Sequence, residues 1–238
     1  MKLLNARAWR TLQFGSIALA SSALFACGGS GSSPSAPTGT IQGTAAVGAA
    51  LANASIQLTC KTGSGTTTAN SNGAYTATFA FNGPCVITAT SGTIVLNSFA
   101  SGAGTFNVTP LTQLLLSYMA GQLGTTVNGL LSGLTTNSNF QAALASPTDV
   151  SNAETAVAAI IKSTYGVTLS SNSFLTTSFT PGTSGADSDL DTLQAAGAIT
   201  SDGQPAATLS AAATTAGAAA PISAGGSTSP TGGTGSGT

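Results

Sequence analysis

The residues best suited to chemistry in this sequence are three alternate carboxylates, Asp187, Asp189 and Asp191. Side chains at this spacing can converge on one hard cation, as they do at the start of a calcium-binding loop. A twelve-residue EF-hand loop begun at Asp187 would need glycine at its sixth position and glutamate at its twelfth, where this sequence has Thr192 and Ala198. The alternative is that the aspartates cap and charge the first turn of a helix, which the helix dipole favours. We expect that capping role, and a metal site is the second interpretation.

Catalysis by other groups is not expected. The sequence has no histidine, and histidine is the commonest general base and the usual partner of a serine or cysteine nucleophile. Beyond residue 26 the only lysines are Lys61 and Lys162, and neither stands in an S-x-x-K frame. Glycine motifs that cradle phosphates or form a nucleophile elbow are missing as well. We therefore expect no enzyme activity and no cofactor, and the one catalytic alternative is a hydrolase that uses aspartates such as Asp189.

The amino-terminal end has the pattern of a bacterial export signal. Lys2, Arg7 and Arg10 precede an apolar run over residues 14–26, and a positive start before a short apolar segment is typical of a signal peptide. Such a run is too short to cross a ~30 Å hydrocarbon core, which takes about 20 helical residues. We therefore expect residues 1–26 to be removed on export.

Residues 24–27, L-F-A-C, resemble the lipobox of bacterial lipoproteins. The family usually has a small residue two positions before the cysteine, and this sequence has Phe25 there. The resemblance implies that Cys27 becomes the lipid-bearing first residue of the mature chain, and several acyl chains at about 0.8 kcal/mol per buried CH₂ would hold it at a membrane. Two glycines follow Cys27 in place of the acidic residue that retains such proteins at the inner membrane, so the outer membrane of a Gram-negative bacterium is expected. An ordinary signal followed by a chance cysteine is the alternative.

The chain after residue 26 has 212 residues, two lysines and six acidic residues, which gives a net charge of −4. A basic surface for nucleic acid is therefore not expected. Two cysteines besides Cys27 remain, Cys60 and Cys85. In an exported protein we expect them to form a disulfide, which for a loop of about 25 residues contributes roughly 3 kcal/mol. Two buried free thiols are the alternative.

Composition divides the chain after the signal into four parts. Residues 27–38 contain mostly glycine, serine, proline, alanine and threonine, which predicts a flexible tether. Residues 39–108 are the expected β domain, and residues 109–205 the expected helical region. Residues 206–238 contain small residues and no charge, which predicts a disordered low-complexity tail. The serine, threonine and proline content of that tail also suits O-linked glycosylation.

Short runs of β-branched residues, separated by glycine and asparagine, fill residues 39–108. Such runs at a spacing of roughly 8 to 12 residues are typical of a β-sandwich. Asn72-Gly73 is the clearest turn signal, because a type I′ hairpin needs positive φ at both central residues and Asn-Gly tolerates it. We therefore predict a sandwich in which the strands that flank this turn pair as a hairpin.

Two stretches in this region carry a recognisable order, L-A-N-A-S-I-Q-L at residues 51–58 and T-T-A-N-S-N-G-A-Y at residues 67–75. They resemble the carboxypeptidase regulatory-like domain, a transthyretin-like (prealbumin-like) β-sandwich. The resemblance covers about 70 residues and implies a fold far more than an activity, because this domain is not the catalytic one in the carboxypeptidases. Under this resemblance Ile56 and Leu58 face one core layer, with Tyr75 opposite.

A first helix is predicted directly after the β domain. Thr109 suits the N-cap and Pro110 the first helical position, where its missing N–H costs nothing. Apolar residues then recur at helical spacing over residues 111–118. The run N-V-T-P-L-T-Q-L-L-L at residues 107–116 also resembles uncharacterised lipoproteins of Gram-negative proteobacteria. This second resemblance implies a location and no mechanism.

Two further helices are predicted. Residues 151–154, S-N-A-E, read as a capping box that starts a helix with apolar residues on one face. Gly166 is suited to its end. A shorter helix is expected over residues 189–196.

These observations predict a structural or protein-interaction module of the cell envelope, attached to the membrane through its lipid. An unknown envelope protein or a glycan is the expected partner. A carbohydrate-binding or adhesion module is the alternative function, and it would stack sugar rings on aromatic side chains. The sole tryptophan, Trp9, lies in the signal peptide. Tyr75, Tyr118 and Tyr165 are therefore the candidate platforms, although packing explains each of them as well.

Overall fold

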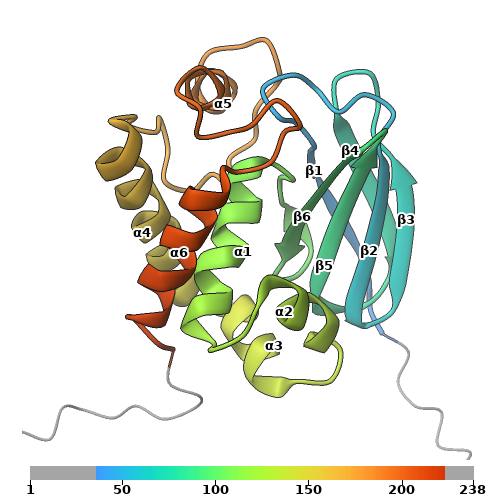
Figure 1. Ribbon diagram of the computed structural model, residues 1–238. Coiled ribbons are helices and arrows are strands. Elements are labelled where there is room, and N and C mark those ends of the chain that lie inside the picture. The colour runs from blue at the N-terminus through green and yellow to red at the C-terminus, as the bar shows by residue number, and fades with distance from the viewer. Residues whose placement is uncertain (1–35, 223–238) are drawn as a thin grey trace, which may run out of the picture. The chain divides into compact units, whose positions relative to one another are not determined.

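The structure is a computed structural model that describes residues 36–222. The predicted signal peptide, Cys27, the tether up to residue 35 and residues 223–238 of the predicted tail lie outside the described residues. Within residues 36–222, seven strands are followed by six helices (Figure 1). The predicted order of a β region and then a helical region is confirmed. No helix in this range is both long and apolar enough to span a membrane.

The strands form two sheets. The smaller sheet has the order β4-β1-β7 and the larger the order β3-β2-β5-β6. Neighbouring strands are antiparallel except β1 and β7, which are parallel. The strands are β1 (Thr38–Thr44), β2 (Ser55–Thr62), β3 (Ser64–Thr68), β4 (Ala74–Ala80), β5 (Asn82–Ser91), β6 (Ile94–Ala100) and β7 (Gly104–Thr105).

Alternation along the strands places apolar side chains of both sheets in one core. In β2, Ile56, Leu58 and Cys60 are buried, whereas the residues between them are exposed, as the two-residue period of a strand requires. From the smaller sheet, Ile41 and Tyr75 belong to the same buried cluster. The expected burial of Ile56 and Leu58 in one sheet and of Tyr75 in the other is confirmed.

The turn at Asn72-Gly73 differs from the predicted hairpin. It leads from β3 in the larger sheet to β4 in the smaller one, so the flanking strands are not partners in one sheet. Gly73 has a φ of 75°, but Asn72 is not among the residues with positive φ, so the turn is not type I′. Oδ1 of Asn70 accepts hydrogen bonds from the N–H groups of Asn72 and Ala74, at 2.9 and 3.1 Å. The hairpin prediction was wrong because asparagine and glycine serve equally well in an Asx turn that crosses between sheets.

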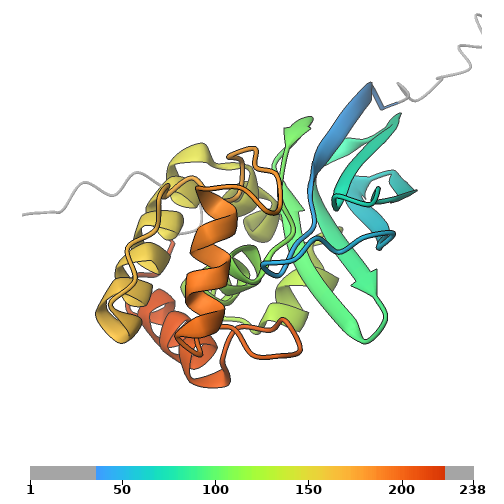
Figure 2. The same cartoon turned by 90° about the horizontal axis from the view of Figure 1, so that it is seen from above.

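The helices gather on one side of the β region (Figure 2). They are α1 (Pro110–Gln122), α2 (Val127–Gly133), α3 (Ser138–Ala145), α4 (Pro147–Tyr165), α5 (Ala186–Ala195) and α6 (Ala207–Ala218). The predicted start of α1 is confirmed, since Oγ1 of Thr109 accepts from the N–H of Thr112 and Oγ1 of Thr112 accepts from the N–H of Thr109. Twelve of the thirteen residues of α1 are buried, because β6, α2, α4 and α6 all contact it. Helix α1 is therefore the centre of the helical region and is buried on nearly all sides, polar residues such as Thr112 and Ser117 included.

Helix α4 starts earlier than predicted. Its N-cap is Ser146, whose Oγ accepts from the N–H of Asp149 at 3.2 Å, and Pro147 is its first residue. The predicted capping box at residues 151–154 was wrong, because an S-x-x-E sequence inside a longer helix has no free backbone N–H groups to cap. The predicted end is confirmed, since Gly166 has a φ of 72° and follows the last helical residue.

Three smaller helices differ from the expectations: one starts earlier than predicted and two were not predicted. Helix α5 begins at Ala186, three residues before the predicted start at 189. Helices α2 and α3 were not predicted. They have seven and eight residues and bury one and two of them, respectively, which leaves too short an apolar pattern to recognise in a sequence.

Helix α6 overturns the prediction that the tail is disordered from residue 206. Residues 207–218 are helical and pack along α1. Gly217 lies so close to α1 that a β-carbon there would overlap the carbonyl oxygen of Tyr118, and a β-carbon at Gly121 of α1 would overlap that of Thr214. Small residues permit this approach, so a segment poor in charge and in large apolar residues can still bury its backbone against another helix.

The predicted disulfide between Cys60 and Cys85 is present. The two cysteines are directly opposite each other on β2 and β5, at the centre of the larger sheet. Both are buried, at 2% and 0% exposed. The bond therefore joins two paired strands inside the core.

Removing this disulfide is expected to lower the free energy of unfolding by about 3 kcal/mol, because the unfolded chain regains the freedom of the closed loop. The change is a Cys60→Ala, Cys85→Ala double variant, compared with the wild type by urea unfolding. Dithiothreitol should destabilise the wild type by a similar amount and leave the double variant unchanged. Equal stability of the oxidised wild type and the double variant would contradict the prediction.

Candidate functional site

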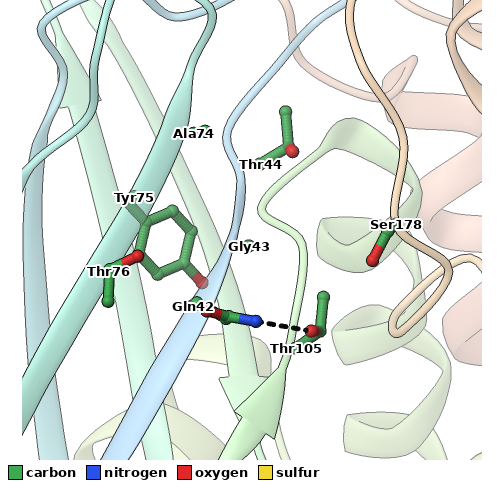
Figure 3. Close-up of a pocket in the computed structure, with 8 residues that line it drawn as sticks. All are labelled: Gln42, Gly43, Thr44, Ala74, Tyr75, Thr76, Thr105 and Ser178. Atoms are coloured by element: carbon green, nitrogen blue, oxygen red, sulfur yellow. Dashed lines mark hydrogen bonds between the residues drawn. The ribbon is translucent and has the colours of Figure 1, made fainter.

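A small cavity beside Tyr75 is the first place where polar groups converge (Figure 3). Its volume is about 170 Å³. The Oη of Tyr75 donates a hydrogen bond of 2.5 Å to the carbonyl oxygen of Phe106. Nε2 of Gln42 lies 3.4 Å from Oγ1 of Thr105, as the dashed line shows. Gln42 and Thr105 therefore pair within the cavity, and the hydroxyl of Tyr75 is taken up by the backbone outside its lining.

Burial of the tyrosines argues against the predicted sugar platforms. Tyr75 is 3% exposed and Tyr118 is 6% exposed. Burial also raises the pKa of the Tyr75 hydroxyl, so this group is neutral and acts as a hydrogen-bond donor. Tyr165 is half-buried and packs against the core. Neither Tyr75 nor Tyr118 offers a ring face to a sugar, and their role is packing.

A second cavity, of about 230 Å³, contains a buried carboxyl group. Glu154 of α4 is 5% exposed, and its Oε1 accepts a hydrogen bond of 2.8 Å from the N–H of Leu175. Burial raises the pKa of Glu154 to about 7, and the hydrogen bond from Leu175 opposes this rise. The residues that line the cavity are Ser101, Phe106, Pro147, Val150, Ser151, Glu154, Ser173, Leu175 and Thr176.

Protonation of Glu154 makes a testable contribution to stability. Because its pKa is higher in the folded protein than the ordinary value of 4.5, the folded state holds the proton more tightly between pH 4.5 and about 7. The contribution of this bound proton to the free energy of unfolding is therefore full below pH 4.5 and is lost as the pH rises to about 7. Glu154→Gln should remove this pH-dependent decrease in the free energy of unfolding, which amounts to about 1–3 kcal/mol.

The measurement is urea unfolding of the wild type and Glu154→Gln at pH 4.5 and pH 8. The variant should gain stability relative to the wild type at the higher pH. Asp149→Asn, a matched change on the same helix outside the cavity lining, should keep the wild-type pH dependence. A stability difference between Glu154→Gln and the wild type that does not vary with pH would refute the prediction.

Asn107 holds the segment that forms one wall of this cavity. It is fully buried, and its Nδ2 donates to the carbonyl oxygens of Phe174 and Thr177, at 3.1 and 2.8 Å. Its Oδ1 accepts from the N–H of Thr44 at 3.2 Å, and its own N–H donates to the carbonyl oxygen of Leu175 at 2.7 Å. One side chain thus connects β1 with the segment 173–177.

The carboxylates of Asp187 and Asp189 form hydrogen bonds with two different segments of the chain. Oδ2 of Asp187 accepts from the N–H of Gly182 at 2.7 Å, and Oδ2 of Asp189 accepts from the N–H and Oγ of Ser170, at 2.8 and 2.7 Å. Among residues 36–222, no group of three histidine, cysteine or acidic side chains is placed to hold a metal ion. Asp187 and Asp189 lie in the first turn of α5, as predicted, but neither caps the helix, because its N-cap is Gly185, and Asp191 lies beyond the first turn. Burial raises the pKa of Asp187, the hydrogen bond from Gly182 lowers it, and Asp191 raises it further.

The open half of the larger sheet is a polar surface with one charged residue at its end. Helices α1 and α3 contact β5 and β6, whereas β2 and β3 expose alternate side chains. Lys61, at the end of β2, is the only charged residue between residues 36 and 108. We call this surface the β2–β3 hydroxyl face. It consists of three cross-strand pairs, Ser55 with Thr68, Gln57 with Thr66 and Thr59 with Ser64.

Comparisons with known proteins add no assignment. No protein-family model, no curated protein and no solved structure matches the chain.

Sequence reasoning missed the roles of Glu154 and Asn107. Glu154 was assigned to a capping box, although it lies one turn before Val157 and two turns before Ile161 on the buried face of α4. A carboxyl group in an apolar stripe is the signal that could have identified it. Asn107 carried no local signal, because its partners lie 63 to 70 residues away in the chain.

Proposed function

We propose that this protein is a lipid-anchored lipoprotein of the bacterial envelope that acts as a structural or protein-interaction module. The lipobox-like residues 24–27 support the anchor, with Cys27 as the lipidated residue. The described fold begins at β1, whose first residue is Thr38. A short segment rich in glycine and serine separates it from Cys27. In this proposal the module is held near the outer membrane.

The observation that carries the interaction role is the β2–β3 hydroxyl face. All six of its side chains are exposed and can form hydrogen bonds, and none is charged. Such a face suits a neutral protein surface, because uncharged groups lose less hydration free energy on contact than charged groups do. The burial of Tyr75 and Tyr118 disfavours the alternative of a sugar-binding module, which would need exposed ring faces.

We also propose that the β region is a transthyretin-like sandwich related to the carboxypeptidase regulatory-like domain. Two features support this relation. Seven strands divide into a three-stranded and a four-stranded sheet. Residues Ile56 and Leu58 are fully buried in one sheet, and Tyr75 is buried in the other. This proposal concerns the fold and assigns no activity.

Site-specific photo-crosslinking in intact cells tests the interaction role. A photoreactive amino acid at Thr66 should give a discrete protein adduct, whereas the same group at Thr215, which is exposed on α6, should give none. Gln57 pairs with Thr66 across the strands, so Gln57→Glu should reduce the adduct by placing a charge in the face. Equal adducts at both positions, or none at Thr66, would refute the role of this face. Retention on envelope polysaccharide without a protein adduct would favour the glycan alternative.

A further inference from the structure

The cavity beside Glu154 is lined by both apolar and hydrogen-bonding side chains, as small-molecule sites usually are. Phe106, Val150 and Leu175 give it an apolar wall, and each is less than a tenth exposed. Hydroxyl groups of Ser101, Ser151 and other residues stand around it. Its volume of about 230 Å³ is below the range of about 300–1,000 Å³ that is usual for drug-sized ligands. A ligand with only a few non-hydrogen atoms therefore fits it.

The carboxyl group is the only ionisable group among the lining residues. Leu175 donates to Oε1, and Oε2 is not among the buried, unpartnered side-chain atoms of residues 36–222, so it is accessible from the cavity. Lys162 is on the same helix but lines a different cavity, and Lys61 is on β2. A buried carboxylate without a counter-charge is costly, so a cationic partner would remove an unfavourable interaction.

We propose that this cavity binds a small organic molecule that carries a primary ammonium group. The ammonium donates a charge-assisted hydrogen bond to Oε2 of Glu154, and the neighbouring hydroxyl groups can accept its remaining hydrogens. The carbon chain of the ligand lies against Phe106, Val150 and Leu175. No residue of β2 or β3 lines this site, so it is independent of the partner contact proposed for the β2–β3 hydroxyl face.

Other ligand classes fit the cavity less well. An anion would meet the negative charge of Glu154. A metal ion would find a single carboxylate, and within residues 36–222 no cluster of three metal-ligating side chains exists. A neutral alcohol could use the hydroxyl groups but would gain no charge pairing. The ammonium group is therefore the feature that the site selects.

Nuclear magnetic resonance titration tests the proposal. The chain from residue 27 onward, with Cys27→Ala, is titrated with n-butylammonium chloride at pH 8, and the amide signals of Leu175, Ser173 and Thr176 are followed. We expect saturable shifts at these amides. n-Butanol and sodium butyrate, matched in carbon skeleton, should bind at least tenfold more weakly or not at all.

Two variants complete the test. Glu154→Gln keeps an oxygen acceptor for the N–H of Leu175 and should weaken n-butylammonium binding at least tenfold. Asp149→Asn, on the same helix but outside the cavity lining, should bind like the wild type. Equal binding of n-butanol and n-butylammonium, unchanged binding by Glu154→Gln, or the same shifts with potassium chloride at equal ionic strength would overturn the proposal.

Discussion

Gly217→Ala will lower the free energy of unfolding by more than about 3 kcal/mol. Alanine is favoured over glycine in a helix by about 1 kcal/mol, so helix propensity alone predicts the opposite sign. The loss arises because a β-carbon at position 217 would overlap the carbonyl oxygen of Tyr118 and force α6 away from α1. Urea unfolding followed by circular dichroism measures the effect.

The matched control for this variant is Ala212→Leu. Ala212 is exposed on the same helix, so a larger side chain there should change stability by no more than about 0.5 kcal/mol. Truncation after Pro205 is a stronger form of the same test. It removes α6 and exposes α1, and the protein should then aggregate or lose cooperative unfolding. If residues 206–238 are a dispensable tail, truncation and Gly217→Ala will both be neutral.

Asn107→Ala will lower the free energy of unfolding by about 4 kcal/mol. The change leaves the N–H of Thr44 without its acceptor and the carbonyl oxygens of Phe174 and Thr177 without their shared donor. Each buried polar group left unpaired costs about 1–3 kcal/mol. The segment that includes Leu175 should then loosen, which hydrogen exchange of the Leu175 amide would detect as lost protection.

Asn139→Ala is the control for Asn107→Ala. Asn139 is exposed in α3, and its replacement should leave both stability and exchange nearly unchanged. Asn107→Asp gives a second comparison, because it keeps the acceptor for Thr44 but loses the donor to Phe174 and Thr177. It should therefore remain strongly destabilised. Wild-type stability of Asn107→Ala would show that water replaces these hydrogen bonds without loss.

The parts of the fold that follow from local chemistry were predictable. Thr109 and Pro110 define the start of α1 because capping depends on neighbours in sequence. The pairing of Cys60 with Cys85 followed from the expectation that the chain is exported, since they are the two cysteines besides Cys27. The turn at Asn72-Gly73 shows the limit, since its residues predict a turn but cannot say whether the next strand joins the same sheet.

The features that depend on packing between distant segments were not predictable from composition. Helix α6 resembles a disordered tail in its residue content, and its order is explained by the burial of Leu209, Ala213 and Gly217 and by the close approach of Gly217 to Tyr118. Burial raises the pKa of Glu154, and the cavity around it includes Phe106 and Leu175, which are distant in the chain. The aspartates at 187–191 illustrate the reverse, because their spacing suggested a metal site while their hydrogen bonds lead to separate segments.

Metabolic labelling with an alkyne fatty acid, followed by membrane fractionation, tests the proposed lipid anchor most directly. The wild type and the Cys60→Ala, Cys85→Ala variant should both carry the label and fractionate with the outer membrane. Cys27→Ala should lose the label. Label that is absent from the wild type, or kept by Cys27→Ala, would contradict lipidation at Cys27 and leave a secreted protein without the proposed anchor.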